Sequence, residues 1–175
     1  MSRLQCGVSL RYGGYETMED LARSTRKKAA VSVQIQYQQK RLSALDAIRV
    51  VMNGDTIVVP TAVGEPPALL TALSDARRDF HGVQVVQILP VRKYGYFDPE
   101  TAEHVRHTSY FFSGISRAGG QEGWTDFIPA NFSELPVLLE RRLIASDVVF
   151  SMASPMDEHG FFSLSLAADY TMAAL

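Results

Sequence analysis

The sequence is poor in cysteine: Cys6 is the single one among 175 residues, so no internal disulfide can form. This composition is typical of a reducing compartment, and we expect a cytoplasmic protein. No apolar run approaches the ~20 residues of a membrane span, and the first residues lack the apolar core of a secretory signal. We therefore expect no membrane partner.

A strong excess of one charge is also missing, since the formal net charge is −2. Residues 1–42 hold eight basic and three acidic residues, a balance of +5, and the rest holds nine basic and sixteen acidic residues, a balance of −7. The basic stretch is dilute and has no interleaved aromatic residues, so we expect solvated surface and no nucleic-acid partner.

Motifs that would announce a particular chemistry are absent as well. There is no G-x-G-x-x-G, no P-loop and no G-x-S-x-G nucleophile turn. His104 and His107 could share one face of a helix, but no further residues complete a ligand set, and surface or hydrogen-bonded histidines are the simpler interpretation. We expect no metal site.

What is present is an alternation of helix and strand in residues 43–89. Ser43 is a good N-cap for a helix reaching about Asn53. Asp55–Pro60 then reads as a strand that is apolar on both faces, a second helix begins at Pro66-Pro67, and Val83–Leu89 is the next strand. The pattern predicts one α/β domain, with an open, mainly parallel sheet covered by helices on both faces.

Other segments give weaker signals. Val148–Met152 reads as a buried strand, the glycine-rich stretch 114–123 as a flexible loop, and the alternation in 31–36 as an edge strand or extended arm. Thr171 could cap a last helix, but the chain stops at Leu175 after about one turn, and an isolated turn is unstable. We therefore expect the 175 residues to be part of a longer polypeptide.

Two loops follow predicted strands at the edge where α/β proteins bind ligands. The first, 61–66, contains Gly64, which lets another backbone approach closely, and it leads into a helix start. The second, 154–159, packs Asp157, Glu158 and His159 into one turn. An ordinary strand-to-helix turn and a solvated hairpin turn are the alternatives at the two places.

Several short motifs, taken in order, resemble the amino-terminal half of the acetyl-CoA hydrolase/transferase family, which includes 4-hydroxybutyrate CoA-transferases. They are Tyr37-Gln38-Gln39-Lys40-Arg41-Leu42, Gly54-Asp55, Val63-Gly64-Glu65-Pro66, Arg106-His107, Asp126-Phe127-Ile128-Pro129, Phe132-Ser133-Glu134-Leu135-Pro136, Ser154-Pro155, Asp157-Glu158-His159-Gly160 and Asp169-Tyr170-Thr171. The resemblance covers residues 37–175 and leaves 1–36 as an extension of unclear structure. It implies an open-sheet fold related to that of sugar-phosphate isomerases.

The resemblance also implies a reaction. A glutamate attacks an acyl-CoA thioester, an enzyme glutamyl-CoA thioester forms, and a small carboxylic acid or water takes over the next step. That glutamate lies in the carboxyl-terminal half of the family, and none of Glu65, Glu134 or Glu158 matches it, so no catalytic residue is assigned here. Coenzyme A would be a substrate, with no permanently bound cofactor. The implied partners are an acyl-CoA, a small carboxylate, the carboxyl-terminal half and further copies of the chain.

The implied binding residues lie in the two loops. Val63 and Gly64 would line the acyl site, with Glu65-Pro66 fixing the helix start behind them, and Asp157-Glu158-His159-Gly160 would form a second loop. Thr61 departs from the family, where a histidine often stands near this position. The alternative function is a free-standing α/β domain that binds CoA, a nucleotide or a partner protein without chemistry.

Overall fold

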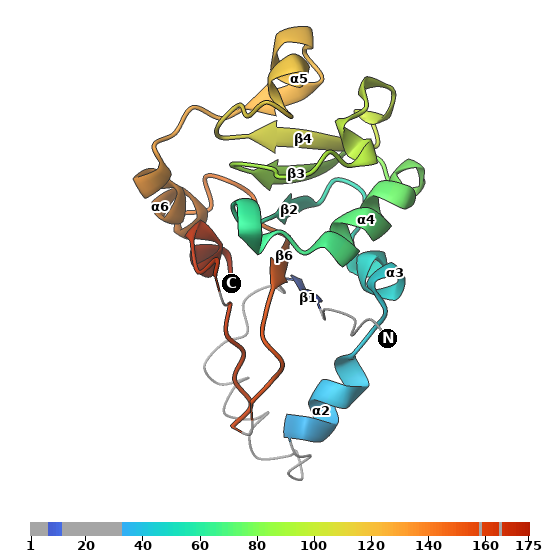
Figure 1. Cartoon of the computed structure of the whole chain (residues 1–175), viewed down its shortest axis with the longest axis vertical. Helices are drawn as coiled ribbons and strands as arrows, with labels where there is room; N and C mark the ends of the chain where they lie inside the picture. The colour runs from blue at the N-terminus through green and yellow to red at the C-terminus, as the bar shows by residue number, and fades with distance from the viewer. Residues whose placement is uncertain (1–6, 12–32, 158, 165) are drawn as a thin grey trace.

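A computed structural model of the chain describes residues 7–11, 33–157, 159–164 and 166–175. Its centre is a six-stranded sheet in the order β1-β6-β2-β3-β4-β5 (Figure 1). The strands are β1 (Gly7–Arg11), β2 (Thr56–Val58), β3 (Val83–Gln87), β4 (Val105–Ser109), β5 (Thr125–Phe127) and β6 (Val148–Met152). Five of them run parallel, and β1 pairs antiparallel with β6 at the edge. The predicted α/β architecture is confirmed.

Both faces of the sheet are buried, as the apolar strand sequences predict. Along β2, Ile57 packs into one hydrophobic cluster and its neighbour Val58 into the other, because successive side chains of a strand point to opposite faces. The two residues and Val59 have no exposed surface. The sheet is therefore the middle layer of three.

On one face lie α3 (Ala44–Ala47), η1 (Ile48–Val50) and α4 (Pro67–Asp75). The Ser43 cap is confirmed, since its Oγ accepts from the Asp46 N–H at 3.1 Å, but the helix is shorter than predicted and tightens into η1. Leu69, Leu70 and Leu73 of α4 are fully buried against the sheet. Each such side chain contributes about 1.5–3 kcal/mol of burial free energy.

The opposite face is covered by η6 (Phe132–Glu134), α6 (Leu135–Glu140) and η7 (Tyr170–Ala174). A capping box starts the first of these, with Glu134 accepting from the Asn131 N–H at 2.7 Å. The last segment is a 3-10 helix, and its cap is Asp169 rather than the predicted Thr171.

Two predicted segments differ from the structure. The glycine-rich stretch 114–123 contains a helix, α5 (Arg117–Glu122), and is not a loop throughout. The alternation in 31–36 predicted an extended segment, but α2 (Val33–Lys40) is a helix; residues 31 and 32 lie outside the described part. The division of the chain after residue 36 stays a prediction.

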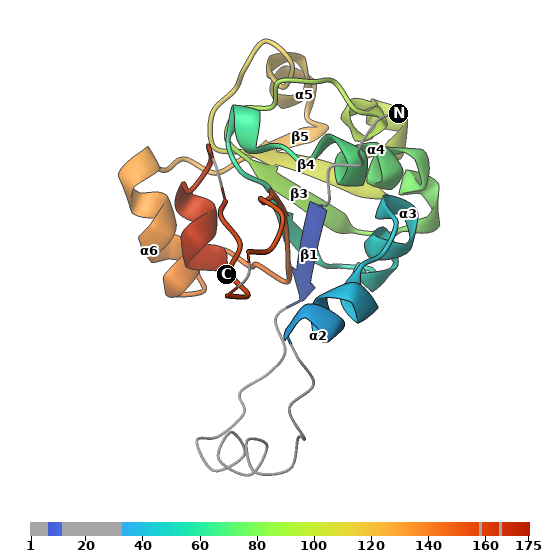
Figure 2. The ribbon, with the colours of Figure 1, turned by 60° about the horizontal axis from the view of Figure 1, so that its bottom comes forward.

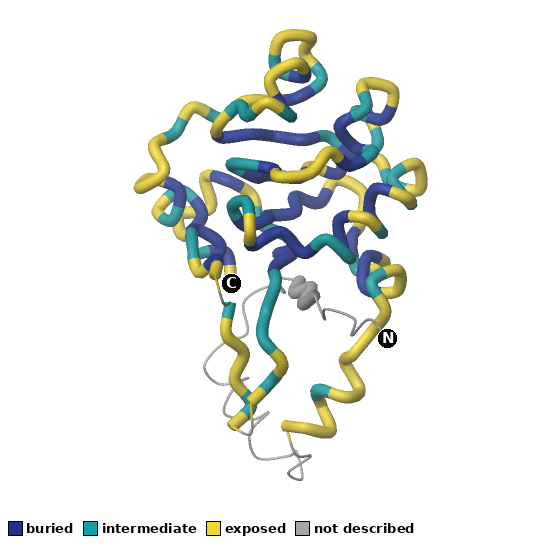
Figure 3. The backbone as a smooth tube through the Cα atoms, in the orientation of Figure 1, coloured by how far each residue is buried: buried dark blue, intermediate teal, exposed yellow. Residues whose placement is uncertain are grey.

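After β6 the chain leaves the body as a narrow arm, residues 153–157 and 159–164 (Figure 1), and Gln34 of α2 contacts it at Asp157. In Figure 2 this end of the molecule is turned toward the viewer. Figure 3 shows that buried residues concentrate in the sheet and its covering helices, whereas α2 and the outer arm are mostly exposed. Among the described residues, no helix has both the length and the apolar character needed to cross a membrane.

Candidate functional site

The loop that follows β2 is a strained turn at the carboxyl edge of the sheet. It forms η2 (Ala62–Gly64), and Ala62 has a φ of +46°, in the left-handed region that residues with a side chain rarely adopt. The Ala62 N–H donates to the Leu89 carbonyl at 3.0 Å, which ties this loop to the one after β3. Strain of this kind costs about 1–3 kcal/mol and is common where a backbone is held for function.

Gly64 is required by packing. A Cβ at this position would lie 2.2 Å from the Ala167 Cβ and 2.6 Å from the Pro60 Cβ, so no other residue fits without a shift of the chain. The preceding Val63 points outward and is 63% exposed. In this turn Gly64 is therefore packed against the body of the protein, and the apolar side chain of Val63 is exposed to solvent.

The carboxyl-terminal segment closes against the same loop. The Thr61 N–H donates to Asp169 Oδ2 at 2.8 Å, and the other oxygen of that carboxylate accepts from the N–H and hydroxyl of Thr171. The buried Tyr170 hydroxyl donates to the Val59 carbonyl. These contacts hold the turn from the side of η7.

Glu65 is turned into the protein, with only 3% of its surface exposed. Its Oε1 accepts from Gln87 Nε2 and from the Val91 N–H, both at 2.8 Å, and its Oε2 accepts from the Tyr94 hydroxyl at 3.4 Å. Burial raises the pKa of Glu65, while these hydrogen bonds and the charge of Arg92 act in the opposite direction. The carboxylate therefore links the loops after β2 and β3.

Sequence reasoning missed the partners of Glu65. Gln87 also donates to the Pro60 carbonyl at 3.2 Å, so it bridges the end of β2 and the carboxylate. Burial and the neighbouring Glu65 raise the pKa of Tyr94 to about 12. A polar residue that ends an apolar strand, as Gln87 does, was the signal that could have revealed this cluster.

The second predicted loop lies elsewhere. Asp157 organises the tip of the arm, where its Oδ1 accepts from the N–H groups of His159 and Phe161 at 2.9 and 2.8 Å. Its carbonyl accepts from Gln34 of α2, and Gly160 lies against Val33 with a φ of +90°. Glu158 lies outside the described residues. The structure thus brings Thr61, Val63, Gly64 and Glu65 together, and it places Asp157 and Gly160 against α2, with His159 in the same turn. The binding role of both sets stays a prediction.

The two histidines considered for a metal are not on a helix. His107 lies on β4, fully buried, with its ring 4.6 Å from that of Phe97, and burial lowers its pKa to about 3. His104 precedes the strand, and its Nδ1 lies 2.8 Å from the Phe80 carbonyl oxygen. Within the described ranges, no three His, Cys, Asp or Glu residues gather as metal ligands.

Comparison with known proteins gives a consistent result. Residues 20–175 match the model of the acetyl-CoA hydrolase/transferase N-terminal domain. Succinyl-CoA:cyclohexane-1-carboxylate CoA transferase of Geobacter metallireducens is 40% identical over 152 residues, which are 85% of this chain and 34% of that protein. The 4-hydroxybutyrate coenzyme A transferase of Clostridium kluyveri is 30% identical over 138 residues, or 79% of this chain and 32% of the relative.

Solved structures agree with the sequence comparison. RipA from Yersinia pestis superposes with a TM-score of 0.71 at 27% identity, covering 82% of this chain and 36% of that protein. A 4-hydroxybutyrate CoA-transferase from Porphyromonas gingivalis superposes with a TM-score of 0.66 at 23% identity, over 82% of this chain and 32% of that one, which supports the fold. The chain spans about a third of the length of these relatives.

Proposed function

The chain belongs to the acetyl-CoA hydrolase/transferase family, and from this premise we propose that it supplies one wall of the acyl-CoA site of a CoA-transferase. The reaction proposed is the movement of CoA between an acyl-CoA and a small carboxylic acid. The transferase activities named for the relatives support this class of reaction. The remaining walls would come from a carboxyl-terminal portion of the kind that makes up the other two-thirds of those relatives.

The proposed chemistry is covalent. A glutamate carboxylate from that portion attacks the thioester carbonyl, the C–S bond breaks, and an acyl-glutamyl anhydride and CoA thiolate form. The thiolate then attacks the glutamyl carbonyl of the anhydride and releases the acyl group as a free carboxylate. The acceptor carboxylate then attacks the glutamyl-CoA thioester and forms a new anhydride and CoA thiolate. The thiolate attacks the acceptor's carbonyl carbon, which gives the new acyl-CoA and the free glutamate. In a hydrolase, water would take the place of the acceptor carboxylate.

Neither Glu65 nor Glu134 is placed to act as the nucleophile. Glu65 is buried and accepts three hydrogen bonds, and Glu134 closes a capping box. A carboxylate held in this way is not free to approach a thioester. Glu65 therefore has a positioning role in the proposal, and Glu134 a structural one.

The observation that carries the proposal is the strained Ala62–Gly64 turn. It lies at the carboxyl edge, where open α/β sheets bind ligands, and it presents Val63 outward. Of the turn's backbone donors, the N–H groups of Ala62 and Gly64 already have acceptors, whereas that of Val63 has none within the described residues, so it can donate to an oxyanion. The Val63 side chain would contact the acyl group beside this donor.

The test joins this chain to the remaining two-thirds of the Geobacter relative and measures CoA exchange between an acyl-CoA and a carboxylate. We expect exchange in the fusion, and Val63→Asp should lower kcat/KM by about tenfold or more, because it places a charge against an apolar acyl group. Leu45→Asp on α3, which is also exposed and lies on the opposite face of the sheet from α6, is the matched control and should change little.

A folded fusion that binds CoA tightly but exchanges nothing would contradict the proposal and favour a binding role without chemistry. Equal losses in the two variants would remove Val63 from the site. A cytoplasmic location and homo-oligomerisation stay predictions. The exposed apolar side chains of Val137, Leu143 and Met172 around α6 and η7 support a surface that a partner covers.

A further inference from the structure

The loop after β3 places two cations at the same edge of the sheet as the Ala62–Gly64 turn. Arg92 and Lys93 are both exposed. Within the described part of the chain, neither makes a hydrogen bond or an ion pair. We propose that Arg92 and Lys93 form an anion-binding site for a charged group of the substrate, either the carboxylate of the acid or a phosphate of CoA. The inference rests on the proposed function and adds a second contact point to it.

The loop is fastened immediately before and after the two cations. The Val91 N–H donates to the buried Glu65, and Tyr94 is buried with its hydroxyl toward the same carboxylate. The Tyr94 ring stacks on that of Tyr96 at 5.5 Å between centroids. Two anchors three residues apart leave little freedom to the backbone that carries Arg92 and Lys93.

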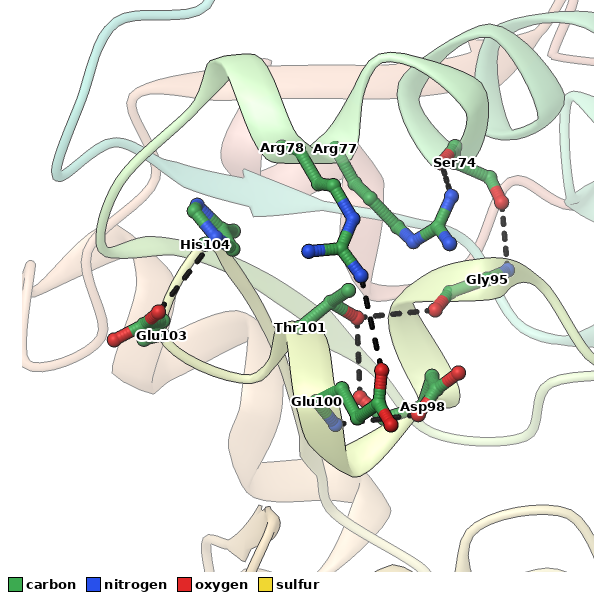
Figure 4. Close-up of polar contacts among 9 residues, drawn as sticks. All are labelled: Ser74, Arg77, Arg78, Gly95, Asp98, Glu100, Thr101, Glu103 and His104. Carbon is green, nitrogen blue, oxygen red and sulfur yellow. Dashed lines mark hydrogen bonds and ion pairs between the residues drawn. The ribbon is translucent and has the colours of Figure 1, made fainter.

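A further set of contacts fixes the segment to α4 (Figure 4). The Gly95 N–H donates to Ser74 Oγ at 2.6 Å, and Thr101 Oγ1 donates to the Gly95 carbonyl at 3.1 Å. Arg77 holds the end of α4 by donating to the Ser74 carbonyl at 2.7 Å. A Cβ on Gly95 would lie 2.8 Å from Ser74 Oγ, so the close approach needs glycine. The cations thus stand on a backbone that is already ordered, which lowers the entropy lost on binding.

The surroundings fit an anionic ligand next to an apolar one. The Ala62 N–H bond to Leu89 joins the cation loop to the turn that exposes Val63. Glu65, the acid that these loops share, is buried and accepts its three hydrogen bonds from Gln87, Val91 and Tyr94, so the charge of Arg92 acts on it without an ion pair. An arginine can hold a carboxylate or phosphate with two parallel hydrogen bonds, and a lysine adds a point charge. A substrate with an apolar acyl group and a nearby anion matches this pair of loops.

The experiment titrates the 175-residue chain with three probes and follows backbone amide resonances by NMR. The probes are propionate as a short carboxylate, succinate as a dicarboxylate, and adenosine 3′,5′-bisphosphate as the phosphate-bearing end of CoA. Variants are Arg92→Gln, Lys93→Gln and both together. Arg49→Gln is the matched control, because Arg49 lies on η1, away from the fastened loop, and its ion pair with Asp46 is solvated.

We expect at least one probe to shift residues 91–95, with about fivefold weaker binding in each single variant, a larger loss in the double variant, and weaker binding at high salt. Preference for the carboxylates assigns the site to the acid, and preference for the bisphosphate assigns it to CoA. No binding by the wild-type chain, or equal binding by the double variant, overturns the inference. If the fusion exchanges CoA and the double variant has a normal KM, the proposed function stands and this site is excluded. If the chain binds the anions but the fusion exchanges no CoA, this site stands and the proposed function is contradicted.

Discussion

Glu65 shows how one buried carboxylate can organise two loops. Replacing it with alanine leaves the Val91 N–H and Gln87 Nε2 without their acceptor. An unsatisfied buried donor costs about 1–3 kcal/mol, so we expect Glu65→Ala to lower the free energy of unfolding by roughly 2–4 kcal/mol. Glu65→Gln keeps an oxygen for both donors and should cost roughly 1 kcal/mol. Urea unfolding of the two variants measures the difference, and equal losses would contradict the role given to the carboxylate oxygen.

His107 makes the stability depend on pH. Burial lowers its pKa from 6.5 to about 3, so between these values the unfolded chain binds a proton that the folded chain does not. Stability should therefore fall as the pH decreases below 6.5, by up to about 1.4 kcal/mol per pH unit relative to a variant without the group. The comparison is chemical unfolding of the wild type and His107→Leu from pH 7 to pH 4. Glu65 is present in both proteins, so its own titration cancels, and parallel profiles would refute the prediction.

Single residues were predicted unevenly from the sequence. Gly64 and Glu65 stood out because a glycine and an acid followed a buried strand, and the structure gives each a tight environment. For His107 the sequence favoured a surface or hydrogen-bonded histidine, but the side chain is fully buried and its ring nitrogens have no partner among the described residues. Its burial depends on Phe97, which comes from a distant turn, and no local pattern reveals that contact.

At the scale of elements, the turn η2 is the part that should tolerate least change. Gly64→Ala forces a Cβ to within 2.2 Å of Ala167, so the carboxyl-terminal segment must move. We expect a loss of about 1–3 kcal/mol, measured as a lower Tm. Gly114→Ala is the control, because a Cβ there meets nothing within 4 Å, and the same loss in both variants would contradict the packing argument.

Helices and strands with a buried stripe were predictable, and those with exposed or glycine-rich sequences were not. The leucines of α4 and the apolar runs of β2, β3 and β6 carry their own pattern. In α5, Gly119 and Gly120 are set by packing, because Trp124 and Thr125 occupy the place of one Cβ and the Phe112 ring that of the other. The glycines of α5 therefore reflect close packing, although they had predicted a flexible loop. In α2, Val33 and Ile35 are both about half exposed, so no buried face stabilises the strand that their alternation predicted.

On the scale of the whole molecule, the structure divides into a buried body and an exposed extension. Strands β2, β3 and β6 are covered on both faces, whereas α2 has eight residues and none of them is buried. Among the described residues, the contacts within the extension include the rings of Tyr37 and Phe162 at 5.6 Å and the bond from Gln34 to the Asp157 carbonyl. A helix of this length is marginal in water without tertiary packing.

This contrast predicts a wide range of amide exchange rates in the isolated chain. Opening of α2 and the arm exposes little apolar surface, so we expect their amides to exchange within seconds, while those of β2 and β3 exchange only through global unfolding. Hydrogen-exchange mass spectrometry resolves these segments as separate peptides. Slow exchange of α2 at high protein concentration, lost on dilution, would show that a second copy covers the extension. Slow exchange at every concentration would show that the arm packs on α2 more firmly than the contacts within the extension indicate.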